Sequence, residues 1–206
     1  LVLIGHSLGT MVSRYYIERL GGKSRVERVI LMGGPHRGAV QGLISMLSGP
    51  ELLPFGIMGE RLRKVYMSFP ASYQILPTYP IPVDGNGTTI NFLEDESWVP
   101  EQYLPLLRGA REFRRELGMR SSIPAVSIFG YGLKTTANLN IQRDAQGGIK
   151  KVDYRAEPNG DSTLLEVSTV LEGTEIHPVQ QYHGSLFVDN DVKMRLKMEL
   201  TRPFSN

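Results

Sequence analysis

The chain begins "LVLIGHSLGT", and no other stretch limits the possible folds as strongly. Residues 1–4 are a continuous aliphatic run, which favours a strand covered on both faces, as in a parallel sheet. From Leu8 to Leu20 apolar residues recur every three to five positions, the spacing of a helix with one buried face. The stretch therefore predicts a strand and a helix joined by a tight turn, with Ser7 in that turn.

The position of Ser7 between two glycines is typical of a serine nucleophile. In a tight strand-to-helix turn, glycine at positions 5 and 9 would remove side chains that collide with neighbouring backbone. The serine hydroxyl would project above the sheet, and the N–H of Leu8 at the helix start would stabilise an oxyanion. The alternative is that Ser7 only caps the helix. We favour the nucleophile because the motif lies between an apolar strand and an amphipathic helix.

A serine nucleophile needs a histidine base, and the chain has four histidines. When the serine lies in such a turn, the order along the chain is serine, acid, histidine. His6 is expected to point away from the serine along the turn, and His36 comes before any plausible acid. His177 precedes Pro178, which restricts it to an extended conformation. His183 lies in a loop before the last expected helix, so it is the favoured base.

Asp161 is the favoured acid, because it stands in the loop "PNGDST" and precedes His183 by 22 residues. The remaining candidates are better interpreted as solvated side chains or helix caps: Asp144, Asp153, Asp189 and Asp191. The sequence therefore predicts a catalytic triad of Ser7, Asp161 and His183, with Leu8 as a backbone oxyanion donor.

The rest of the chain reads as core strands with an insertion. "RVERVILMGGPHRGAV" predicts a second core strand over about Val26–Met32 with a loop beside the serine turn, and "PAVSIFGYG" predicts a third. "KTTANLNIQRDAQGGIKKVDYRAEP" alternates as a β-hairpin does. The last helix has Asn190 or Asp191 available as its N-cap.

Residues 39–119 differ in texture from the core, being rich in proline and tyrosine with an almost uncharged first part. We expect this segment to be an inserted cap or lid that closes over the site. The alternative, which we favour for most of its apolar residues, is an ordinary subdomain core. Leu52, Leu53 and Phe55 are its candidate substrate contacts, since exposed apolar surface usually marks a ligand or membrane contact.

Composition excludes several classes of function. The net charge is only +2, and no basic run is interleaved with aromatic residues, so nucleic acid is not an expected partner. The chain has no cysteine, which excludes disulfides, a cysteine nucleophile and thiolate metal sites. It also argues against a disulfide-rich secreted protein. We expect neither a metal nor a cofactor.

Five short motifs carry a family likeness: "GHSLG", "GGPHRGA", "YQILPTYP", "GDSTL" and "HGSLFVDNDV". Their order resembles the lecithin:cholesterol acyltransferase family, which includes phospholipases and phospholipid:diacylglycerol acyltransferases. The resemblance implies an α/β-hydrolase fold with a cap, and an acyl-enzyme formed from a lipid ester. It assigns the same three roles to Ser7, Asp161 and His183. The family's acid loop usually reads glycine-aspartate-glycine-threonine-valine-proline, whereas here Ser162 follows the aspartate.

The expected fold class is thus α/β: the C-terminal part of an α/β-hydrolase domain, a mostly parallel sheet flanked by helices, with a cap and a β-hairpin. In that fold the serine turn follows the fifth strand, so we expect residues 1–206 to lack the N-terminal half of their domain and to be inactive alone.

The expected function is hydrolysis or acyl transfer on a lipid ester, with a membrane or lipoprotein surface as a candidate partner. The alternatives are a small-ester hydrolase or inositol-lipid deacylase of the same fold, and a non-catalytic binding module.

Overall fold

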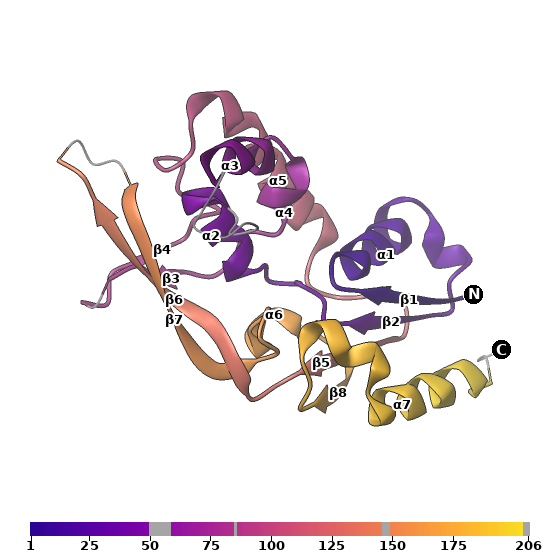
Figure 1. Cartoon of the computed structure of the whole chain (residues 1–206). Helices are drawn as coiled ribbons and strands as arrows, with labels where there is room; N and C mark the ends of the chain where they lie inside the picture. The colour runs from indigo at the N-terminus through magenta and orange to yellow at the C-terminus, as the bar shows by residue number, and fades with distance from the viewer. Residues whose placement is uncertain (50–58, 85, 146–148, 204–206) are drawn as a thin grey trace. The chain divides into compact units, whose positions relative to one another are not determined.

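The computed structural model describes residues 1–49, 59–84, 86–145 and 149–203 (Figure 1). The chain divides into two compact units. The first consists of Leu1–His36, Glu116–Thr135 and Glu157–Asn206, and the second of Arg37–Arg115 and Thr136–Ala156. Ser7, Asp161 and His183 all belong to the first unit, so the candidate site can be described within it.

The first unit is built on a four-stranded parallel sheet in the order β1-β2-β5-β8. The strands are β1 (Val2–His6), β2 (Arg28–Met32), β5 (Ala125–Gly130) and β8 (Glu175–Val179). Every residue of β2 is buried, as its position between two other strands requires. The second expected strand is therefore present, two residues shorter at its start than the sequence indicates.

Helices cover both faces of this sheet. Val29 and Leu31 of β2 pack with Ile17 of α1 (Leu8–Arg19). The alternate residues, Ile30 and Met32, pack with Val192 of α7 (Asn190–Thr201) on the opposite face. This two-sided burial explains why the strand has no polar alternation. Shorter elements complete the unit: the 3₁₀ helices Gly22–Ser24 and His183–Val188, and α6 (Glu166–Thr169).

A buried arginine ties α1 to the segment after α5 (Leu104–Leu117). The Nη2 atom of Arg14 donates to the carbonyls of Leu117, Gly118 and Arg120, at 2.9, 2.9 and 3.1 Å. Burial lowers the pKa of Arg14 to about 10, so the side chain stays charged at neutral pH. Its charge supports hydrogen bonds to carbonyls that the end of a helix leaves without intrahelical donors. The helix that begins at the serine turn is thereby anchored at its middle.

The second unit contains most of α5 and three shorter helices, α2 (Val40–Ser48), α3 (Gly59–Met67) and α4 (Pro70–Gln74). It also holds the 3₁₀ helix Glu101–Tyr103 and a small antiparallel sheet of β3 (Ile81–Pro82) and β4 (Thr89–Ile90). Its core is formed by large apolar side chains that are almost fully buried, among them Leu43, Met46, Tyr73, Leu76, Phe92 and Leu107. Most of the predicted cap lies in this unit. That it closes over the site stays a prediction, and Leu52, Leu53 and Phe55 lie outside the described residues.

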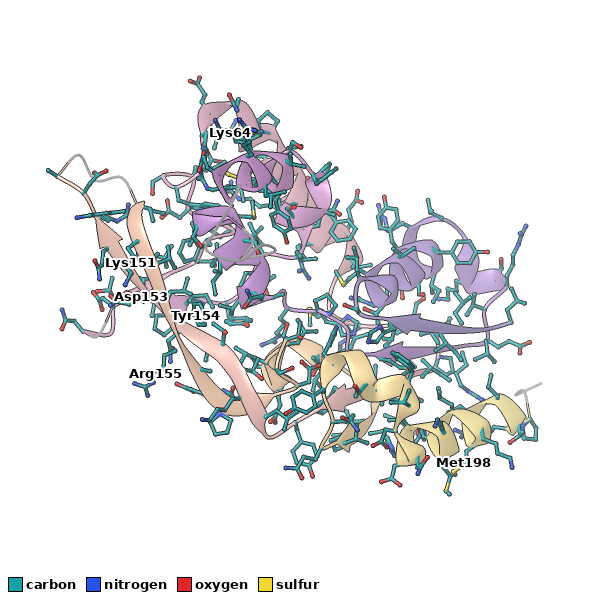
Figure 2. The ribbon with its side chains drawn as sticks, in the orientation of Figure 1. Lys64, Lys151, Asp153, Tyr154, Arg155 and Met198 are labelled. Carbon is teal, nitrogen blue, oxygen red and sulfur yellow. The ribbon has the colours of Figure 1, made fainter. Side chains whose placement is uncertain are left out.

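The expected β-hairpin is present. β6 (Leu133–Arg143) and β7 (Ile149–Gly160) form a two-stranded sheet. Residues 136–143 of β6 and 149–156 of β7 belong to the second unit, and the remaining residues of both strands belong to the first. Asp153, one of the carboxylates set aside as an acid, lies on β7 (Figure 2). Its Oδ1 atom is 2.7 Å from Nζ of Lys151, so this carboxylate is part of a surface ion pair.

Of the candidate caps for the last helix, Asp189 is confirmed, and the expectation of Asn190 or Asp191 is wrong. Asn190 and Asp191 already belong to α7, and the cap is Asp189. Asp189 has extended backbone, and its Oδ1 atom accepts from the N–H groups of Asp191 at 2.9 Å and Val192 at 3.2 Å. An N-cap must lie outside the helical backbone for its side chain to reach these donors. These hydrogen bonds, first the one from Val192, lower the pKa of Asp189 below its usual range.

We predict that Asp189→Ala lowers the free energy of unfolding by about 1 kcal/mol at neutral pH. Because the folded-state pKa is lowered, the contribution of the charged cap is present above the ordinary carboxyl pKa and is lost as the pH falls through the folded value. Urea unfolding at a series of pH values measures this. Asp189→Asn is the matched control, since asparagine caps without titrating. An alanine deficit that does not shrink in acid would contradict the assignment.

Candidate active site

The turn at Ser7 joins β1 to α1 with strained backbone. Ser7 has φ 53° and ψ −126°, a positive φ that residues with a side chain rarely adopt. Its N–H donates to the carbonyl of Met32 on β2 at 2.9 Å. Its carbonyl accepts from Thr10 twice, from the backbone N–H at 3.0 Å and from Oγ1 at 2.7 Å. Backbone hydrogen bonds therefore hold the strained residue on both sides.

The two glycines of the motif have different roles. A Cβ atom at Gly5 would lie 2.8 Å from the carbonyl oxygen of Gly9, so only glycine fits at position 5. A Cβ atom at Gly9 would meet nothing within 4 Å. The expectation that glycine at position 9 avoids a collision is therefore wrong. The close approach in this turn is between the strand end and the backbone of the first helical residues, and Gly5 alone permits it.

Ser7, His183 and Asp161 form a continuous hydrogen-bonded chain. The Nε2 atom of His183 is 2.9 Å from Oγ of Ser7, and its Nδ1 atom is 2.8 Å from Oδ2 of Asp161. An ionised carboxylate only accepts, so Nδ1 carries a proton and donates to Asp161. Nε2 of a neutral imidazole is then left to accept from the serine hydroxyl. Asp161 is fully buried and His183 is only 8% exposed.

The acid loop holds Asp161 in place before it meets the histidine. Its Oδ1 atom accepts from the N–H groups of Thr163 at 3.0 Å and Leu164 at 2.7 Å. Its backbone carbonyl accepts from the N–H of His183 at 2.9 Å. The two residues are therefore joined twice, once through side chains and once through backbone. Buried carboxylates need such partners, because an unpaired buried charge is costly.

Ser162 is the residue at which this loop departs from the pattern of the family that the sequence resembles. Its φ is 76°, in the left-handed region that favours glycine, which is the residue that the resemblance leads us to expect at this place. The N–H of Ser162 donates to Oγ1 of Thr135 at 2.9 Å, which fixes the peptide in this orientation. The loop therefore keeps the shape that glycine would allow, and the serine is strained.

Two further glycines shape the site: Gly33, in the loop expected beside the serine turn, and Gly130, for which no role was expected. A Cβ atom at Gly33, just after β2, would lie 3.0 Å from the Cε1 and Nδ1 atoms of His183. A Cβ atom at Gly130, the last residue of β5, would lie 2.5 Å from Cβ of Asp161. The signal in the sequence is a glycine at the carboxyl end of each predicted core strand. Such glycines let a loop approach the strand closely.

The other histidines lie in different surroundings. His36 is fully buried after β2, with its ring against Gly34. His177 is half-buried within β8, and none of the hydrogen bonds found in the described residues joins it to Ser7. The side chain of His6, which was expected to point away from the serine along the turn, is close to His183. Its Nε2 atom is 3.0 Å from the carbonyl oxygen of His183.

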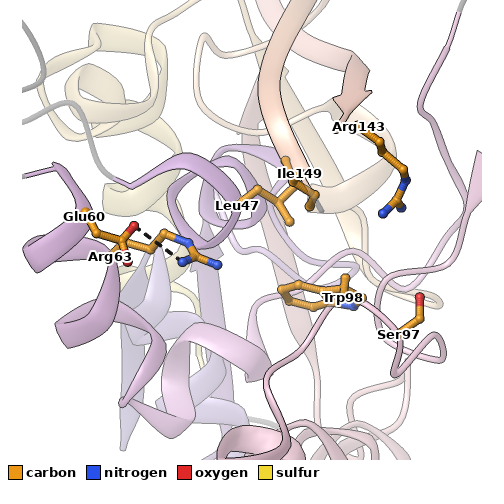
Figure 3. Close-up of a pocket in the computed structure, with 7 residues that line it drawn as sticks. All are labelled: Leu47, Glu60, Arg63, Ser97, Trp98, Arg143 and Ile149. Atoms are coloured by element: carbon orange, nitrogen blue, oxygen red, sulfur yellow. Dashed lines mark ion pairs between the residues drawn. The ribbon is translucent and has the colours of Figure 1, made fainter. Parts of the chain in front are cut away.

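The second unit contains a separate cavity of about 250 Å³ (Figure 3). Arg63 is fixed on its wall by a 2.7 Å hydrogen bond from Nε to the carbonyl of Met46 and by an ion pair with Glu60. The lining combines charged, polar and apolar side chains: Leu47, Glu60, Arg63, Ser97, Trp98, Arg143 and Ile149.

Across the described ranges, no group of three or more histidine and acidic side chains is arranged to hold a metal ion. Within the same ranges, no helix combines the length and apolar character needed to cross a bilayer.

The comparison with family models decides the relationship. The model for lecithin:cholesterol acyltransferase matches residues 1–119. The chain belongs to the lecithin:cholesterol acyltransferase family. The search of curated proteins gave no match.

Two solved structures share the fold of this family member. A chain in the crystal structure of the Tle4–Tli4 complex superposes with a TM-score of 0.66 over 100% of this chain, at 14% identity. The lipase BlEst2 of Bacillus licheniformis, in its mature form, superposes with a TM-score of 0.50 over 97% of it, also at 14% identity. The chain has the α/β-hydrolase fold. It covers 60% and 64% of those two chains, less than two thirds of either.

We predict that Ser162→Gly stabilises the protein by about 0.5–1 kcal/mol. Relief of the left-handed conformation contributes about 1–2 kcal/mol, and the larger freedom of glycine in the unfolded chain offsets part of it. The position of the Asp161 carboxylate should be unchanged, because its contacts within the loop come from Thr163 and Leu164. Thermal unfolding checks this against Ser122→Gly, a serine whose φ is not positive. Destabilisation by Ser162→Gly greater than that of the control would contradict the prediction.

Proposed function

We propose that this chain carries a serine-dependent acyl hydrolase or acyltransferase site acting on a lipid ester. The observation that supports it most is the hydrogen-bonded chain from Ser7 through His183 to Asp161, located where the strands of a parallel sheet end. Open α/β folds bind ligands at that edge of the sheet. The strained turn at Ser7 supports the same assignment. So do Gly33 and Gly130, where the absence of a side chain leaves room for His183 and Asp161.

The geometry suggests a role for each residue. Oγ of Ser7 attacks the ester carbonyl carbon as its proton passes to Nε2 of His183. Asp161 accepts from Nδ1, which keeps the imidazole in the required tautomer and stabilises the imidazolium. The carbonyl oxygen becomes an oxyanion, and the proposed donor to it is the N–H of Leu8, the first residue of α1.

Collapse of this intermediate breaks the bond to the leaving alcohol, which takes the proton from His183, and leaves the acyl group on Ser7. Water or a second alcohol then attacks the acyl-enzyme, with His183 again accepting and returning a proton. The two outcomes are hydrolysis and acyl transfer, and they differ only in which nucleophile reaches the acyl-enzyme. The first half of the reaction is common to both.

Apolar surface beside the serine supports a lipid substrate. Leu8 is 44% exposed and Val12 is 66% exposed, and their spacing of four residues places them on the same side of α1. Phe187, whose ring meets His6 edge-on, is 54% exposed. Exposed apolar side chains grouped near a site usually mark a ligand or membrane contact. Membership of the lecithin:cholesterol acyltransferase family and the fold shared with a lipase point the same way. Residues 39–119 remain the proposed cap.

We predict that Ser7→Ala in the intact protein abolishes labelling by a fluorophosphonate probe and lowers ester hydrolysis by at least about 10⁴-fold, because the attacking atom is removed. Ser185→Ala, a serine two residues from the base, is the matched control and should label as wild type does. Wild-type turnover should also favour long-chain over short-chain p-nitrophenyl esters. Labelling of the Ser7 variant would contradict the nucleophile, and a short-chain optimum would contradict the lipid substrate.

We predict that His183→Ala lowers kcat by on the order of 10⁴-fold, whereas His177→Ala changes it by less than about threefold. The reason is that His183 touches both other members of the hydrogen-bonded chain. Steady-state kinetics on the two purified variants, with circular dichroism to check folding, tests the choice of base. Equal losses in the two variants would contradict it.

A further inference from the structure

We propose that His6, the residue before the serine, is a positioning residue that holds the base His183 by its backbone carbonyl. The proposal rests on the proposed function, because it assigns His6 a part in the same reaction. Its starting point is that the side chain of His6 contacts His183, although the sequence suggested that it points away from the site.

The direction of the hydrogen bond follows from its acceptor. Nε2 of His6 is 3.0 Å from the carbonyl oxygen of His183. A carbonyl oxygen only accepts, so Nε2 carries the proton and donates it. The rings of the two histidines also meet, with centroids 5.0 Å apart and planes inclined by 35°. Phe187 lies edge-on to His6 at 6.0 Å. The imidazole of His6 is therefore held by contacts with the loop that carries the base.

The backbone of His183 is fixed on both sides by these contacts. Its N–H donates to the carbonyl of Asp161 at 2.9 Å, and its carbonyl accepts from His6 at 3.0 Å. The acid loop thus positions the amide side of the residue, and the end of β1 positions the carbonyl side. Because the imidazole extends from the backbone held between them, its two nitrogens are directed at fixed points.

His6 also links the base to the nucleophile. His6 is the last residue of β1, and Ser7 is the next residue of the chain. The hydrogen bond from His6 therefore positions the base relative to the same strand end that positions Oγ of Ser7. Catalytic groups need placement within about 0.5 Å, and a misplacement of about 1 Å can cost on the order of 100-fold in rate. Loss of this donor should consequently lower kcat and leave KM almost unchanged.

The test compares two substitutions of similar shape. In His6→Gln the side-chain amide nitrogen replaces Nε2 as a donor, whereas His6→Met has nearly the same size and no donor. We expect His6→Gln to keep kcat within about fivefold of wild type and His6→Met to lose at least tenfold more, with KM within about twofold in both. His6→Phe, which keeps a ring without a donor, should behave as His6→Met does. Thermal unfolding identifies any variant that fails to fold.

Three controls separate this proposal from the proposed function. Wild type must react with the fluorophosphonate probe and Ser7→Ala must not; if wild type fails, the proposed function fails. If wild type reacts, equal kcat values for His6→Gln and His6→Met overturn the role of the donor. A loss confined to KM would also overturn it, because a substrate contact and not a positioned base would then explain the effect. Rescue by glutamine alone supports it.

Discussion

The parallel pairing of β1, β2, β5 and β8 is the constraint on which the candidate site depends. Parallel strands end at the same edge of a sheet, so residues that follow four distant segments of the chain are brought to one line. Ser7 follows β1, Gly33 follows β2, Gly130 ends β5 and His183 follows β8 by four residues. Only burial of both sheet faces makes this arrangement stable, and α1 and α7 provide it.

Within that edge, backbone groups carry much of the positioning. The strained peptide of Ser7 is held by the carbonyl of Met32 and by Thr10, and the carboxylate of Asp161 is held by two N–H groups of its own loop. Backbone groups are rigid donors and acceptors, so they place a side chain with less loss of entropy than another flexible side chain would. In the proposed site, side chains supply the chemistry, and the sheet and its backbone hydrogen bonds set the geometry.

The glycines of the site also contribute to its geometry and not to its chemistry. Gly33 and Gly130 contribute no chemistry, yet an added Cβ atom at Gly130 would collide with Asp161, and one at Gly33 would lie only 3.0 Å from the ring of His183. Ser162 is the opposite case, because it carries a side chain at a position whose backbone conformation favours glycine. Such strain is kept in a structure only when surrounding contacts hold it, and the hydrogen bond to Thr135 is one of them.

The sequence alone was sufficient for the class of fold and for the choice of candidate residues. A continuous apolar run, a serine between glycines and an amphipathic helix each reflect local physics, so they predicted β1, the turn and α1. The order serine, acid, histidine selected Asp161 and His183 from several carboxylates and histidines. The hydrogen bonds of Arg14 to the carbonyls after α5 and the contact of His6 with His183 were not predictable. Each joins residues far apart in the chain, and no local pattern records such an approach.

The N-cap at Asp189 depended on where the preceding 3₁₀ helix ends. Several neighbouring polar residues could each cap a helix, so the sequence did not decide which of them does. Local pattern thus determined which residues were candidates, and only tertiary packing decided which of them touch, because distance in the chain carries no information about distance in space.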